Sequence, residues 1–223
     1  MHFEILIEDE SGKELLDIIV PKIISVPENS YKITFFKGLG YIPKDLHKEP
    51  DPKKKQLLNK LPAMLRAYGK WSMRKDLSVI IVVDCDTRDC LTFKQELTEV
   101  LNSCNPKPVT FFRIAIEEIE AWLLGDKTAI EKAYPKMNKA EYARYKQDFP
   151  VGTWEKLADI TLSVSLAKYL KKAAYPEIGK QKFEWAQRIG KNMNINNNVS
   201  QSFNCFRKKL QELAQIDTVT SGT

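Results

Sequence analysis

The sequence predicts an α/β fold: a mainly parallel four-stranded sheet flanked by helices, followed by an α-helical C-terminal region. In the first half of the chain, short apolar runs alternate with amphipathic stretches, which is the pattern of βαβ units. From about residue 117 onward the apolar residues follow a helical spacing, and no further strand is indicated. A chain of 223 residues with 43% hydrophobic content is long and apolar enough to bury a sizeable core.

Four apolar runs are predicted to be strands. The strongest signal is at residues 78–83, where five consecutive β-branched residues fit a central strand that is buried on both faces. The other three predicted strands cover residues 3–7, 31–37 and 109–116.

The stretches between and after these strands have the apolar periodicity of helices. Pro21 and Pro62 mark points at which two of the helices are expected to kink, break or begin. The predicted helices cover residues 13–24, 53–71, 90–103, 117–124, 127–134, 139–146, 153–172, 181–193 and 201–215. We therefore expect an α/β core over residues 1–125, a helical region over 126–216 packed on it, and a flexible tail over 217–223.

Composition limits the classes of function. No stretch approaches the roughly 20 apolar residues of a membrane span, and the N-terminus lacks the pattern of a secretory signal, so a cytoplasmic protein is expected. The four cysteines (Cys85, Cys90, Cys104, Cys205) have neither a CxxC pair nor zinc-site spacing, which favours a reducing compartment. With only two histidines, a His-rich metal site is not expected.

The net charge of +6 averages two unlike parts of the chain. Residues 43–75 hold ten Lys and Arg against three acids, and residues 165–191 hold seven against two, so these two basic segments carry +7 and +5 and the remainder −6. Basic segments beside an acidic centre are the layout expected of a protein that holds a phosphodiester backbone. The predicted nucleic-acid contacts are Lys53, Lys54, Lys55, Lys180 and Lys182.

Acidic residues follow three of the predicted strands. Glu8 ends the first strand, Asp84 and Asp86 end the third, and Glu117 and Glu120 follow the fourth. In an open parallel sheet, ligands bind outside the carboxyl ends of the strands, so these carboxylates are expected to meet at one edge. Such crowding is unfavourable unless a cation neutralises it, and ligand oxygens without histidine or thiolate indicate Mg²⁺ or Mn²⁺.

Simpler roles compete for some of these acids. A lone Asp after a strand is usually a turn residue or a helix cap, and we favour that role for Asp89. Glu117 and Glu120 are three residues apart and share one helix face, but acids in a first helical turn also suit the helix dipole. For the Asp84–Asp86 pair we favour metal binding.

Glu8 at the end of the first strand, with the Asp84-x-Asp86 pair after a later hydrophobic strand, resembles the Toprim catalytic core of topoisomerases, bacterial primases and overcoming-lysogenisation-defect (OLD) type nucleases. The segments 5–9, 82–90, 113–126 and 200–206 resemble an uncharacterised Toprim-like bacterial family often encoded beside an ABC-type ATPase. That family usually has Gly after the strand-one glutamate, whereas this chain has Asp9.

The resemblance implies a Toprim-like, Rossmannoid core and a catalytic site made by Glu8, Asp84 and Asp86. Glu8 would act as metal ligand or general acid/base, and the two aspartates would bind Mg²⁺ or Mn²⁺, with Glu117 or Glu120 as candidates for a second ion. The implied function is a metal-dependent nuclease acting on DNA or RNA, in a phage-defence or restriction-like system with an ATPase partner. The alternative is a catalytically silent regulatory or binding module for that ATPase, and a homodimer stays open.

Overall fold

The computed structural model describes residues 1–24, 28–72, 76–116, 118–149 and 152–220, with the backbone alone for 216–220. Four strands form one parallel sheet in the order β2-β1-β3-β4. The strands are β1 (His2–Ile7), β2 (Ser30–Phe35), β3 (Leu77–Asp84) and β4 (Val109–Ala115). The predicted α/β fold with a parallel four-stranded sheet is confirmed.

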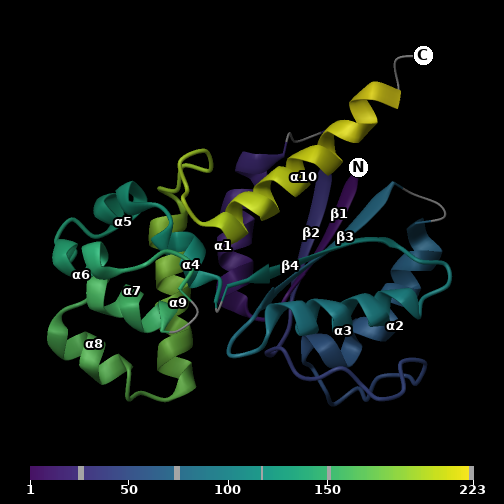
Figure 1. Cartoon of the computed structure of the whole chain (residues 1–223), viewed down its shortest axis with the longest axis horizontal. Helices are drawn as coiled ribbons and strands as arrows, with labels where there is room; N and C mark the ends of the chain where they lie inside the picture. The colour runs from purple at the N-terminus through teal and green to yellow at the C-terminus, as the bar shows by residue number, and fades with distance from the viewer. Residues whose placement is uncertain (25–27, 73–75, 117, 150–151, 221–223) are drawn as a thin grey trace.

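Helices surround this sheet and form most of the second half of the chain (Figure 1). The first three are α1 (Glu10–Ile23), α2 (Leu57–Ser72) and α3 (Cys90–Asn102). After β4 come α4 (Glu120–Leu124), α5 (Lys127–Ala133), α6 (Lys139–Arg144), α7 (Thr153–Thr161), α8 (Val164–Leu170), α9 (Tyr175–Gly190) and α10 (Gln201–Thr220).

The central strand β3 is buried along its whole length, as its β-branched run predicts. Alternate side chains enter two different cores, because successive residues of a strand point to opposite faces of the sheet. Ile80 and Val82 pack with α1, α9, α10 and the short helices after β4. Val79, Ile81 and Val83 pack with α2 and α3. Both faces of the sheet are therefore covered (Figure 1).

The order of the strands determines where a ligand site is expected. From β1 the chain passes through α1 to β2 on one side, and later through α2 to β3 on the other side of β1. Since α1 and α2 belong to the cores on opposite faces, β1 and β3 meet at a topological switch point. Their carboxyl ends lie side by side, with Ile7 opposite Val82 in the register. Open α/β sheets bind ligands in the crevice at this place.

Several helix boundaries differ from the predicted ones. The helix predicted over 153–172 is divided into α7 and α8, because Leu162 is extended and the Ser163 hydroxyl accepts a hydrogen bond from the Leu166 amide to begin a new helix. The helix α9 begins at Tyr175 and not at 181, with Pro176 in its first turn, where a missing N–H does no harm. Pro21 and Pro62 lie inside helices that continue past them, and α10 extends to Thr220.

Candidate functional site

Glu8 extends β1 at the switch point. Its backbone carbonyl accepts a hydrogen bond from the Gly38 amide (2.8 Å), which fixes the residue beside the end of β2. Its side chain is half-buried, and Oε2 is fully buried without a hydrogen-bond partner among the described residues. The next residue, Asp9, caps α1: its Oδ1 accepts from the Gly12 amide at 2.7 Å, and Oδ2 accepts from the Ser11 hydroxyl at 2.9 Å. The Oε2 atom of Glu8 therefore lacks the kind of hydrogen-bond partner that both carboxylate oxygens of Asp9 have.

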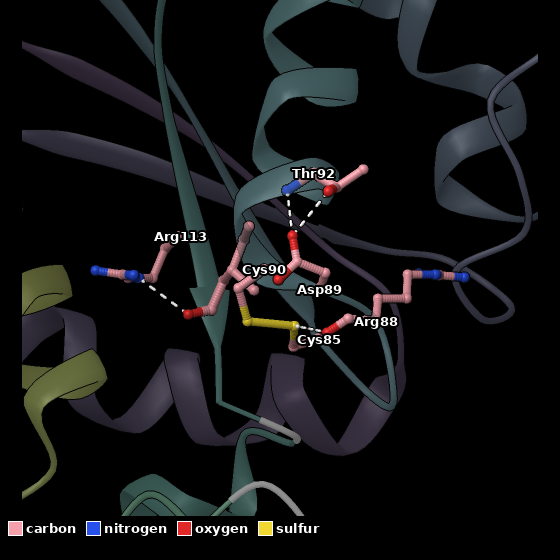
Figure 2. The surroundings of a disulfide bond; sticks show 7 residues. Cys85, Arg88, Asp89, Cys90, Thr92 and Arg113 are labelled. Carbon is pink, nitrogen blue, oxygen red and sulfur yellow. Dashed lines mark hydrogen bonds between the residues drawn. A yellow bond between two sulfur atoms is a disulfide. The ribbon is translucent and has the colours of Figure 1, made fainter.

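Asp84 is the last residue of β3 and is almost completely buried, with 7% of its surface exposed. Two residues later Asp86 is exposed and adopts a left-handed backbone conformation, with φ at 48°. Asp89 caps α3, because one carboxylate oxygen accepts from both the amide and the hydroxyl of Thr92, at 2.8 and 2.7 Å. The capping role that we favoured for Asp89 is thus confirmed (Figure 2).

A disulfide joins Cys85, at the end of β3, to Cys90, at the start of α3 (Figure 2). The bond closes the short segment that carries Asp86 and so restricts where that carboxylate can lie. The spacing of the cysteines did not predict this bond, and the bond disagrees with the reducing compartment that we expected, because disulfides are rare there. Cys104 and Cys205 are free thiols.

The acids after β4 meet a buried lysine from α9. The Lys182 ammonium donates a hydrogen bond to Glu118 Oε1 at 2.7 Å and lies 3.4 Å from Glu120 Oε2. Lys182 and Glu120 are both buried, with 7% and 2% of their surfaces exposed. We call Glu8, Asp84, Glu118, Glu120 and Lys182 the edge cluster, because together they occupy the carboxyl edge of the sheet.

Three carboxyl groups of the edge cluster have raised pKa values, and burial is the first cause for each. Burial, followed by the charges of Asp9 and Asp86, raises the pKa of Glu8 to about 7. Burial, followed by the charges of Glu8 and Glu120, raises the pKa of Asp84 well above its ordinary value, although Lys182 acts in the opposite direction. The pKa of Glu120 is raised as well, again mainly by burial.

The pKa of Lys182 is raised by carboxyl groups of the edge cluster, which favours its charged form. Burial alone would lower its pKa, but the neighbouring carboxylates, Glu120 first, raise the pKa well above the ordinary value of a lysine. The ammonium is therefore charged throughout the neutral range. One fixed positive charge thus stands among at least four carboxyl groups.

The edge cluster fits a hard cation in its chemistry and its charge. Its carboxyl oxygens are the ligands that Mg²⁺ prefers, and the buried oxygen of Glu8 has no hydrogen-bond partner among the described residues. Over the same described ranges, no group of three His, Cys, Asp or Glu side chains is arranged to hold a metal ion by itself. Mg²⁺ commonly takes one or two carboxylates and completes its shell with waters and substrate phosphates, which Glu8 and Asp84 could support.

The structure describes the lysines predicted to contact nucleic acid, which lie in different environments, but not Glu117. Glu117 lies outside the described residues, so its metal-binding role stays a prediction. Lys182 was predicted as a nucleic-acid contact on the surface, whereas it is buried in ion pairs with the edge cluster. Lys180 is exposed, as are Lys53 and Lys55.

The basic segment before α2 is tied to the edge cluster through the backbone. The Lys55 carbonyl accepts from the Lys37 amide at 3.1 Å, and the adjacent Gly38 amide donates to Glu8. Within this segment the Lys54 ammonium lies over the Tyr41 ring, 4.6 Å from its centre, and donates to the Tyr41 hydroxyl. The backbone at Lys55 is therefore joined, through Lys37 and Gly38, to the end of β1.

The sequence contained a signal for Lys182 that charge counting missed. Ile178, Lys182, Trp185 and Ile189 follow the i, i+4, i+7, i+11 spacing of one helix face, and three of the four are apolar. A lysine in such an apolar stripe is a candidate for a buried ion pair, since an unpaired buried charge is strongly unfavourable.

A parallel α/β sheet with acids at its switch point defines an α/β protein with a candidate acidic ligand site. The chain belongs to the family described as Domain of unknown function (DUF4276), which it matches over residues 7–214. Neither a curated protein nor a solved structure gives a match. Within the described residues, no helix is both long and apolar enough to cross a membrane.

Replacing Lys182 by Met should destabilise the protein by removing the cation from buried carboxylates. Breaking a buried ion pair typically costs about 3–5 kcal/mol, so we expect a loss of that order in the free energy of unfolding at about pH 8. The loss should be smaller at about pH 5.5, where the carboxyl groups can take up protons. Urea unfolding at both pH values measures it. Lys180→Met, at an exposed site of the same helix, is the control, and equal stability of the two variants would contradict the ion-pair account.

Replacing Glu8 by Gln should stabilise the protein increasingly as the pH rises. The folded carboxyl group has a pKa of about 7 against 4.5 when unfolded, so the native state binds more protons between these values and the wild type loses stability across that window. Gln does not titrate, so we expect the variant to gain about 1–3 kcal/mol over the wild type by about pH 8 and little at about pH 4.5. Urea unfolding across this pH range measures the difference in stability between Glu8→Gln and the wild type, and the exposed Glu96→Gln is the control. A difference in stability that did not change with pH would contradict the account.

Proposed function

We propose that the protein is a metal-dependent phosphodiesterase that cleaves nucleic acid at the edge cluster. The observation that carries the proposal is the pairing of Glu8 and Asp84 at the switch point, where burial raises the pKa of both carboxyl groups. Mg²⁺ or Mn²⁺, when bound there, would polarise a phosphoryl oxygen for in-line attack by water. The basic segments beside Glu8 supply positive charge for the nucleic-acid backbone.

In this proposal each side chain has a distinct role. Glu8 takes the proton of the attacking water, because its buried Oε2 has no hydrogen-bond partner among the described residues and can accept one. Asp84 provides carboxylate oxygens for the cation, and waters and the substrate phosphate would complete the shell of that cation. The exposed Asp86, on the segment closed by the disulfide, adds a negative charge that acts on Glu8. Lys182 is a positioning residue, which holds Glu118 and Glu120 at the edge of the sheet.

The finer biological setting also belongs to this proposal. The resemblance of the strand-end motifs to Toprim nucleases supports a Toprim relationship for the core. Its likeness to proteins encoded beside an ABC-type ATPase supports action with such a partner in the cytoplasm, in a phage-defence or restriction-like system. These statements depend on the resemblance and not on the geometry.

A specific observation favours the second candidate function, a catalytically silent module for an ATPase. Lys182 already places one positive charge among the acids, and the described residues include no ready group of three metal ligands. In a silent module the ion pairs would serve only to fix the helical region on the sheet. Cleavage assays separate the two candidates.

Purified protein with millimolar Mg²⁺ or Mn²⁺ should cleave at least one of three substrates: plasmid DNA, single-stranded DNA or RNA. Asp84→Asn and Glu8→Gln should each reduce the cleavage rate by about 10²-fold or more, because they remove a charge or a proton acceptor at the reacting centre. Glu4→Gln makes the same change in the buried part of β1, away from the edge cluster, and should leave cleavage unchanged. Gel assays over time measure the rates, and circular dichroism checks the fold of each variant.

No cleavage of any substrate with either metal ion, together with no rise of the melting temperature on addition of metal, would overturn the hydrolase proposal. That pair of results would favour the silent module.

A further inference from the structure

A pocket of about 410 Å³ opens beside the edge cluster, between the first turn of α1 and the first half of α9. Asp9, the neighbour of Glu8, lines it from one side, while Tyr175, Gly179 and Phe183 line it from the other. Ligand pockets have volumes of this order. No role has been assigned to this pocket by the cleavage proposal.

The helical wall of the pocket has two aromatic side chains with a gap between them. Tyr175, Gly179 and Phe183 are spaced four residues apart and therefore share one face of α9. A side-chain carbon at Gly179 would meet only the Tyr175 ring, at 3.9 Å, so the floor between the rings is open. Tyr175 is 66% exposed, and a planar ligand could stack on its ring.

The charges around the pocket determine which part of a ligand can enter. Asp9 and the exposed Glu10 line its α1 side and would repel a phosphate. The exposed Lys180 is at the other wall and can contact a phosphate. An uncharged planar group therefore suits the interior, with a phosphate held at the rim.

Tyr175 is close enough to the edge cluster to sense its charge. Burial of the hydroxyl, followed by the charge of Asp9 and with contributions from Glu8 and Glu120, raises the pKa of Tyr175. The pocket therefore lies close to the acids at which cleavage is proposed.

We propose that this pocket binds an unpaired nucleobase of a single-stranded nucleic acid, stacked on Tyr175 over Gly179, with the adjoining phosphate at Lys180. The proposal rests on the proposed phosphodiesterase function and specifies its substrate class. A base within a duplex presents only its edges, because both of its faces are covered by stacked neighbours, so duplex nucleic acid fits the pocket less well.

Fluorescence anisotropy with a fluorescein-labelled oligodeoxycytidylate tests this proposal, with EDTA present so that metal-dependent cleavage does not consume the probe. Tyr175→Ala should weaken binding about 5- to 150-fold, which corresponds to the 1–3 kcal/mol typical of one stacked base. Tyr175→Phe should bind within about twofold of the wild type, since the stacking ring is retained. Gly179→Leu fills the floor of the pocket and should weaken binding as Tyr175→Ala does.

Tyr169→Ala removes an exposed tyrosine of α8 that does not line the pocket, and its affinity should match that of the wild type. Equal affinity of wild type and Tyr175→Ala for the single strand would overturn the proposal, as would equal affinity of the wild type for a duplex of the same length. Tyr175-dependent binding, without cleavage in Mg²⁺ or Mn²⁺ and without a rise of the melting temperature on addition of metal, would overturn the hydrolase and leave the base pocket standing. If the protein cleaves nucleic acid and Tyr175→Ala does not change binding, the base pocket is overturned and the hydrolase stands.

Discussion

The ion pairs of Lys182 connect the two halves of this protein. The lysine projects from α9 in the helical second half, and its partners Glu118 and Glu120 follow the last strand of the sheet. Around it, α9 packs on α1 and joins the core on one face of the sheet (Figure 1). The same cation that anchors α9 therefore also determines how much negative charge the sheet edge retains.

The negative charge that Lys182 does not neutralise determines what this site can bind. Burial raises the pKa values of Glu8 and Asp84, and the neighbouring carboxylates raise them further, although Lys182 acts in the opposite direction. Protonation, a divalent cation, or both would relieve the repulsion. In the proposed hydrolase, a metal ion and the substrate phosphate would complete this arrangement of acids. The aromatic pocket next to them offers a place for the base attached to that phosphate.

Much of this arrangement could be predicted from the sequence, because strand pattern and parallel topology are local and general. The β-branched run of β3 predicted a doubly buried central strand, and the strand ends predicted where Glu8 and Asp84 would lie. Tertiary contacts explain the failures. The charge of Lys182 indicated a surface residue, although the apolar helix face on which it lies indicated burial. The disulfide between Cys85 and Cys90 depends on the turn between β3 and α3, which the spacing of the cysteines does not predict.

The most direct test of the account is a measurement of the pKa of the Glu8 side chain. Carbon-detected NMR would monitor the Glu8 carboxyl group during a pH titration, once with and once without Mg²⁺. The Glu8→Gln variant identifies the resonance. The account requires a pKa of about 7 without metal, and a decrease of about one unit or more when Mg²⁺ is added, because a bound cation favours the charged form. A pKa near 4.5 that Mg²⁺ does not change would contradict it.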